Sequence, residues 1–205
     1  MADVRPRWFT QHGEGHAAWY IERFRKMAAA GDDLEGEARL LDAMLPRGAR
    51  VLDAGCGPGR VGAALHARGH TVIGVDVDPA LIEAAQADHP GPRWLVGDLS
   101  TFQLDEPAFD AAVLAGNVLV FVAPGSEVRV LSQVAAHVRA DGVIVTGFAT
   151  DRDYGLDAFD RDWAAAGLVL EHRFATWDLR PWRADAKFAV TVPPAATVTE
   201  SVAGA

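Results

Sequence analysis

The ten residues VLDAGCGPGR, at positions 51–60, carry the strongest structural signal in this chain. Their apolar beginning is typical of a buried strand, and the glycines that follow predict a sharp turn into a helix. A second apolar run, Thr71 to Val75, ends in Asp76. A strand, a glycine turn and a helix, with an acid at the end of the next strand, form the layout of a nucleoside-binding α/β unit. We expect the Asp76 carboxylate to accept hydrogen bonds from both hydroxyls of a ribose.

Two residues of this region bear on which nucleotide binds. The dinucleotide fingerprint G-x-G-x-x-G/A needs a small residue where this chain has Arg60, which we expect to obstruct close packing of the helix on the strand. Asp53 stands directly before the turn, where a carboxylate disfavours a pyrophosphate and favours a cationic amino acid group. The chain also lacks a Tyr-x-x-x-Lys pair that would donate a proton. An NAD(P)-dependent oxidoreductase is therefore the less favoured alternative.

An acid before G-x-G-x-G, with a second acid at the end of the next strand, resembles the class I S-adenosylmethionine-dependent methyltransferases. The resemblance covers residues 45–150 and is weak at both ends. It implies S-adenosyl-L-methionine as cofactor and S-adenosyl-L-homocysteine as product. It also implies in-line displacement of the sulfonium methyl group by an acceptor. A protein of this fold that binds the ligand or a partner without methyl transfer remains a second alternative.

Strands and helices alternate along most of the chain, which predicts an α/β fold with a parallel sheet and helices on both faces. We expect strands at residues 50–54, 71–75, 93–96, 109–114, 142–148, 168–174 and 186–192. We expect helices at residues 15–30, 34–44, 60–68, 126–139 and 156–166 and from residue 79 to the turn at 89–92, with 1–14 irregular. The resemblance implies a Rossmann-like, seven-stranded, mostly parallel sheet in the order 3-2-1-4-5-7-6, with the last strand antiparallel.

Composition favours one globular domain, since half of the 205 residues are hydrophobic. Within it we expect an N-terminal helical cap or lid at residues 1–45, a cofactor-binding core at 46–194 and a tail at 195–205. The net charge of −9 disfavours binding to nucleic acid or anionic membranes. No apolar stretch approaches the ~20 residues of a membrane span, and no signal peptide is recognisable. We therefore expect a cytoplasmic monomer or homodimer that acts on a small molecule.

The resemblance assigns cofactor contacts to the turns that follow the strands. Asp98 and Leu99 are expected at the adenine ring, while Ala115 and Asn117 border the methionine half of the ligand. Tyr20 belongs to the N-terminal cap and is a candidate contact of the methionine carboxylate. The predicted cofactor-binding residues are Asp53, Gly55, Cys56, Gly57, Gly59, Asp76, Val77, Asp98, Leu99, Ala115, Asn117 and Tyr20.

The sequence identifies no catalytic residue. His12, His16 and several acids are candidate general bases, and nothing in the sequence chooses among them. The two histidines lack an acidic partner at a defined spacing, so we expect no metal site. Cys56 is the only cysteine, and we interpret it as a small packing residue rather than a nucleophile. The Asn-Pro-Pro-aromatic motif of amino-group nucleic acid methyltransferases is absent.

Overall fold

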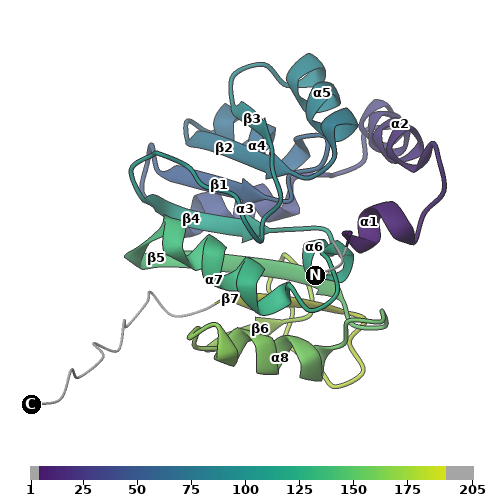
Figure 1. The fold of residues 1–205 in the computed structure, drawn as a ribbon. Coiled ribbons are helices and arrows are strands. Elements are labelled where there is room, and N and C mark those ends of the chain that lie inside the picture. Colours follow the sequence, from purple (N-terminus) through teal and green to yellow (C-terminus); the bar gives the residue numbers. More distant parts are fainter. Residues whose placement is uncertain (1–4, 193–205) are drawn as a thin grey trace, which may run out of the picture.

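A seven-stranded sheet forms the centre of the molecule in the computed structural model, which describes residues 5–192 (Figure 1). The strand order is β3-β2-β1-β4-β5-β7-β6, and β7 runs antiparallel to both of its neighbours. The predicted order and the antiparallel last strand are therefore confirmed. The strands are β1 (Arg50–Ala54), β2 (Thr71–Asp76), β3 (Arg93–Val96), β4 (Phe109–Leu114), β5 (Val138–Ala149), β6 (His172–Phe174) and β7 (Phe188–Val192).

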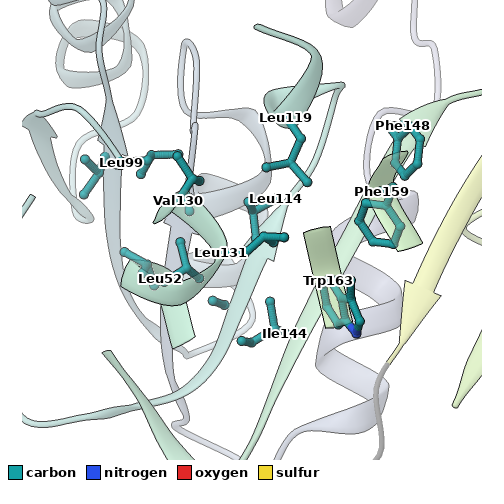
Figure 2. Close-up of a cluster of buried hydrophobic side chains, with 14 of the residues drawn as sticks. Leu52, Leu99, Leu114, Leu119, Val130, Leu131, Ile144, Phe148, Phe159 and Trp163 are labelled. Atoms are coloured by element: carbon teal, nitrogen blue, oxygen red, sulfur yellow. The ribbon is translucent and has the colours of Figure 1, made fainter. Parts of the chain in front are cut away.

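Helices cover both faces of the sheet, as expected from the alternation of elements. The helices are α1 (Arg7–Thr10), α2 (His16–Ala29), α3 (Gly36–Met44), α4 (Arg60–Ala67), α5 (Pro79–Asp88), α6 (Val118–Phe121), α7 (Glu127–His137) and α8 (Leu156–Ala165). Successive side chains of a strand point to opposite faces. In β1, Val51 accordingly belongs to the apolar cluster of α3 and α4, whereas Leu52 belongs to the cluster of α7 and α8, part of which Figure 2 shows.

Four elements differ from the sequence expectation. α1 and α6 were not predicted, because each is a single short turn of helix in a stretch without apolar periodicity. β5 begins at Val138 rather than at 142, because its first residue pairs with Phe109 before a shift in register. β6 begins only at His172, and the preceding Val169 and Leu170 are exposed. The predicted tail at 195–205 lies outside the described residues.

The two N-terminal helices are attached to the sheet domain by polar contacts. Neither α1 nor α2 contributes a buried residue. Arg25 of α2 makes a bidentate ion pair with Asp88 of α5, at 2.8 and 3.0 Å. Arg7 of α1 pairs with Glu127 at 2.9 Å. In Figure 1 the two helices accordingly lie beside α5 and α6. None of the helices in the described part of the chain is both long and apolar enough to span a membrane.

Trp94 of β3 fixes the packing of the first two strands against α4 and α5. Its ring is 5% exposed, and its indole N–H donates to the His89 carbonyl at 2.9 Å. Glycines surround the ring because a Cβ at those places would meet it. One at Gly62 would lie 2.8 Å from Trp94 Cη2, and one at Gly74 would overlap the ring outright. The glycines thus let a large side chain enter the space between helices and sheet.

Replacing Gly74 by alanine should therefore destabilise the fold. The added methyl group has to displace a buried indole, and such overpacking costs about 1–3 kcal/mol. Urea unfolding of Gly74→Ala measures the loss. Gly13→Ala is the matched control, because nothing lies within 4 Å of a Cβ at that position. Equal stability of the two variants would contradict this account of Trp94.

Candidate functional site

A cavity opens beyond the carboxyl ends of the parallel strands, the place where open α/β sheets bind ligands. It contains about 900 Å³ of empty space, part of which is open to solvent. Its walls come from the turns after β1, β2, β3 and β4 and from α1, α2 and α6.

All but two of the predicted cofactor-binding residues line this cavity. They are Asp53, Gly55, Cys56, Gly57, Asp76, Val77, Asp98, Leu99, Ala115 and Tyr20. The structure therefore brings together side chains that are far apart in the sequence, and their contacts with a cofactor remain a prediction. Gly59 and Asn117 are the two that do not line the cavity.

The glycine turn after β1 needs its glycines for two different reasons. Gly55 has a φ of +78°, and a Cβ there would lie 2.5 Å from Cγ2 of Val118 on α6. Gly57 has a φ of +54°, and a Cβ there would point beside the Tyr20 ring, 3.6 Å from Cε1. Gly55 thus allows close packing of two turns, while Gly57 provides the left-handed backbone conformation, since a Cβ there would make only an ordinary contact with Tyr20.

Asp76 closes the far side of the same turn. Its Oδ2 accepts a hydrogen bond from the Gly57 N–H at 2.8 Å, and its Oδ1 accepts one from the Asp78 N–H at 3.0 Å. Burial raises the pKa of Asp76 to about 6, although both backbone hydrogen bonds oppose the rise. A carboxylate at the end of β2 therefore holds the loop after β1 and the start of α5 in place.

Asp53 lies at the base of the cavity and is 1% exposed. The Gly62 N–H of α4 donates to its Oδ2 at 2.8 Å. Burial raises the pKa of Asp53 to about 7, against the opposing effect of that hydrogen bond. Cys56 lies nearby, and burial together with the charges of Asp53 and Asp76 raises the pKa of its thiol well above the usual value. A neutral thiol agrees with the packing role expected from the sequence.

The turn after β3 presents Asp98 and Leu99 to the cavity. Asp98 Oδ1 accepts a hydrogen bond from the Ser100 N–H at 2.8 Å, so this side chain also shapes its own turn. Leu99 is buried and packs into the cluster under α7. Val77, which follows β2, lines the same cavity.

Asn117 and Arg60 make contacts that the sequence did not predict. Asn117 has a φ of +71°, and its Oδ1 accepts a hydrogen bond from the Ala149 N–H at 2.6 Å. Its carboxamide therefore joins the turn after β4 to the end of β5. Arg60 does not obstruct the packing of α4, because its guanidinium makes a bidentate ion pair with Glu37 of α3 at 2.6 and 2.8 Å.

The helices beside the cavity supply side chains that the sequence did not single out. Trp8 of α1 and Phe121 of α6 both line the cavity, as does Phe24 of α2. The one available signal was aromatic residue type, which by itself more often marks packing. Tyr20 was predicted, and its hydroxyl oxygen lies 3.8 Å from where a Cβ of Gly116 would be. Burial raises the pKa of Tyr20, so its hydroxyl stays protonated at neutral pH.

His12 and His16, the candidate bases, lie behind this wall and do not line the cavity. Their rings are stacked, with centroids 3.7 Å apart, and His16 packs on Trp8 with centroids at 4.7 Å. Burial and the neighbouring His12 lower the pKa of His16, with Asp78 opposing. Among the described residues, no group of three or more His, Cys, Asp or Glu side chains is arranged to hold a metal ion.

Comparison with known proteins assigns the chain and its fold to one family. Residues 51–142 match the family model described as a methyltransferase domain. The crystal structure of a TehB-like SAM-dependent methyltransferase from Corynebacterium glutamicum is 45% identical, with a TM-score of 0.84, over 89% of this chain and 100% of that chain. This chain belongs to the SAM-dependent methyltransferases. The family expected from the sequence is confirmed, and S-adenosylmethionine is its cofactor.

Two curated relatives match over shorter parts of their length. An uncharacterized methyltransferase of Mycobacterium tuberculosis is 43% identical over 77 residues, which are 36% of this chain and 39% of that protein. The malonyl-[acyl-carrier protein] O-methyltransferase of Pectobacterium atrosepticum is 30% identical over 151 residues, 73% of this chain and 55% of that protein. This methyltransferase chain thus spans less than two thirds of either curated relative.

The raised pKa of Asp53 predicts how stability depends on pH. The unfolded chain releases this proton near the usual value of 3.8 and the folded chain only at about 7. Between these values the folded state binds more protons than the unfolded state. Asp53 therefore lowers the free energy of unfolding by about 1.4 kcal/mol for each pH unit of increase. The ligand-free Asp53→Asn variant should therefore be more stable than the unmodified protein at pH 8, and this advantage should shrink toward pH 5.

Urea unfolding across this pH range measures the effect. Asparagine keeps an acceptor for the Gly62 N–H, has nearly the same size and carries no charge at any pH. Asp141→Asn, at an exposed position on β5, is the control and should show no such pH-dependent gain. A difference between Asp53→Asn and the unmodified protein that is constant from pH 5 to pH 8 would refute the assignment.

Proposed function

We propose that this chain binds S-adenosyl-L-methionine in the cavity and transfers its methyl group to a small-molecule acceptor. The observation that carries the proposal is the convergence of three acidic side chains on one cavity at the carboxyl ends of neighbouring strands. Asp53 lies near the end of β1, Asp76 is the last residue of β2, and Asp98 follows β3. The order of these residues along the sheet edge matches an elongated ligand with an amino acid at one end and a base at the other.

Asp76 is suited to bind the ribose. Each carboxylate oxygen has about two lone-pair sites, and the backbone of Gly57 and Asp78 occupies one on each oxygen. The remaining sites accept hydrogen bonds from two vicinal hydroxyl groups. In the same way we assign the adenine ring to the turn of Asp98 and Leu99, with Val77 on its apolar face.

Asp53 and Tyr20 are assigned to the methionine half. Asp53 lies buried beneath the glycine turn, where a carboxylate stabilises a cationic amino group. Tyr20 extends from beside Gly57 to beside Gly116, so its ring spans the turns after β1 and β4. We propose that α1 and α2, within the cap expected at residues 1–45, close this half of the cavity, whereas α3 packs against the sheet.

The bound cofactor supplies an activated methyl group on a sulfonium leaving group. The contribution of this chain is then to hold the acceptor in line with that group, and such alignment supplies about 7–11 kcal/mol of barrier reduction. The wall that faces the acceptor is mainly apolar and includes Pro6, Phe121 and Val122. This surface, with the net charge of −9, favours a small acceptor with apolar contact area over a nucleic acid.

Calorimetric titration with S-adenosylhomocysteine tests the cofactor site. The unmodified protein should bind the ligand with micromolar affinity and should not bind NADH. Asp76→Ala removes the acceptor for the ribose hydroxyls and should weaken binding by about tenfold or more, since a hydrogen bond to a charged group contributes about 1.5–3 kcal/mol. Asp141→Ala, at an exposed position on β5, should bind as the unmodified protein does.

Two results would oppose the proposal. Failure of the unmodified protein to bind S-adenosylhomocysteine would remove the assignment of the cavity. Binding of NADH in its place would favour the oxidoreductase alternative. When binding is established, methyl transfer from labelled S-adenosylmethionine to a panel of small thiols, amines and alcohols identifies the acceptor class.

A further inference from the structure

Three aromatic side chains from three separate elements meet along one wall of the cavity. Trp8 comes from α1, Tyr20 from α2 and Phe121 from α6. The Trp8 ring centroid lies 5.4 Å from that of Tyr20 and 5.8 Å from that of Phe121. The interplanar angles of 79° and 83° make both contacts edge-to-face. The rings therefore meet edge to face rather than as a flat stack, and all three border the cavity.

A hydrogen bond fixes the orientation of the central ring. The Trp8 indole N–H donates to Asp78 Oδ2 at 2.7 Å. Asp78 also begins α5, where its Oδ1 accepts from the Ala80 N–H, and its own N–H donates to Asp76. The indole is thus attached to the turn that carries the proposed ribose-binding acid, although α1 is 70 residues away in the sequence.

The position of this wall follows from the elements that it joins. Trp8 reaches the turn after β2, Phe121 follows the turn after β4, and Tyr20 lies between the turns after β1 and β4. The proposed function places the ribose at the end of β2 and the methionine half between the ends of β1 and β4. The sulfur atom joins these two parts of the ligand, so the aromatic wall covers the place where it belongs.

Aromatic faces attract cations. Within the described residues, the guanidinium groups of Arg23 and Arg60 pack over Trp19 and Phe24 rather than over these three rings, although both charges act on Tyr20. Arg60 is the basic residue among the described residues that line the cavity, and its guanidinium is held by Glu37 and packs over Phe24, 5.3 Å from the ring centroid. A cation over Trp or Tyr is stabilised by about 0.5–2 kcal/mol, most strongly where water is excluded. The sulfonium of the methyl donor is such a cation.

We propose that Trp8, Tyr20 and Phe121 form an aromatic box that binds the sulfonium and so distinguishes the methyl donor from the product. The inference rests on the proposed function and adds to it a reason why the product S-adenosylhomocysteine is exchanged for the donor S-adenosylmethionine. On transfer, the methyl group bonds to the acceptor nucleophile and the electron pair of the broken C–S bond stays on sulfur. The product is a neutral thioether, which the box no longer attracts as a cation.

Parallel calorimetric titrations with S-adenosylmethionine and S-adenosylhomocysteine test the box. The measured quantity is the ratio of the two dissociation constants. In Trp8→Leu and in Phe121→Leu the affinity for S-adenosylmethionine should fall while that for S-adenosylhomocysteine changes little, so the preference for the donor falls by about 2- to 30-fold. Trp8→Phe keeps an aromatic ring without the N–H donor and should retain more of the preference than Trp8→Leu.

Trp19→Leu is the matched control. Trp19 is an aromatic residue of α2 that is 57% exposed and does not line the cavity, so its loss should leave the ratio unchanged. Urea unfolding checks that each variant is folded. If Trp8→Leu does not fold, Phe121→Leu carries the same test from a different element.

The outcomes separate this inference from the proposed function. Equal losses of affinity for both ligands in Trp8→Leu and Phe121→Leu, or an unchanged ratio in both, would overturn the aromatic box and leave the cofactor site standing. Failure of the unmodified protein to bind either ligand would overturn both. A selective loss of affinity for the charged ligand in the cavity variants, absent in Trp19→Leu, is the result that supports the box.

Discussion

The carboxylate of Asp76 determines the shape of the site. One oxygen holds the glycine turn after β1 through Gly57, and the other holds the start of α5 through Asp78. The same Asp78 receives the indole of Trp8, so the position of α1 depends on this carboxylate as well. Each hydrogen bond is modest by itself, but a buried carboxylate that lost its partners would be strongly destabilising. The turn, the helix and the N-terminal segment are therefore fixed together.

Burying the carboxylates of this site lowers the folding stability of the ligand-free protein. Asp53 and Asp76 are both nearly inaccessible to water, and the hydrogen bonds to each come from backbone amides. Amide dipoles compensate a buried charge only in part, so burial raises the pKa of both carboxyl groups. The charge of Arg60 opposes the rise at Asp53 only in part, and under the proposed function a cationic ligand supplies further positive charge. Under the proposed function, binding and folding stability are thus linked, because a ligand that binds only the folded state stabilises it.

The sequence predicts the central part of the fold well because that part obeys local rules. The apolar runs of β1, β2 and β4, the glycine turn and Asp76 are all recognisable from residues 51–114, although the strand order came from the resemblance. The contacts that the sequence did not predict depend on distant partners. Asn117 bonds to a strand 32 residues further along the chain, and no local pattern indicates that partner.

The N-terminal segment shows the same limit more strongly. α1 is one turn of helix without periodicity, and Trp8 gains its role from Asp78, which is 70 residues away. Arg60 was expected to disturb packing because its position was compared with a glycine in another fingerprint. Its side chain instead leaves the helix–strand contact and pairs with Glu37. In each case the sequence gives the residue type but does not indicate the distant partner that determines its role.

The attachment of α1 and α2 by polar contacts has a consequence for how this protein can evolve. Neither helix contributes a residue to the buried core, so most substitutions in them change stability little. Proteins tolerate mutations as long as they stay above the stability that function requires. Apart from the side chains that line the cavity, α1 and α2 are therefore free to diversify, while the strands and their turns remain under the strict constraint of packing. Under the proposed function, a lineage descended from this chain can change the cover of its site through these two helices and keep its sheet unchanged.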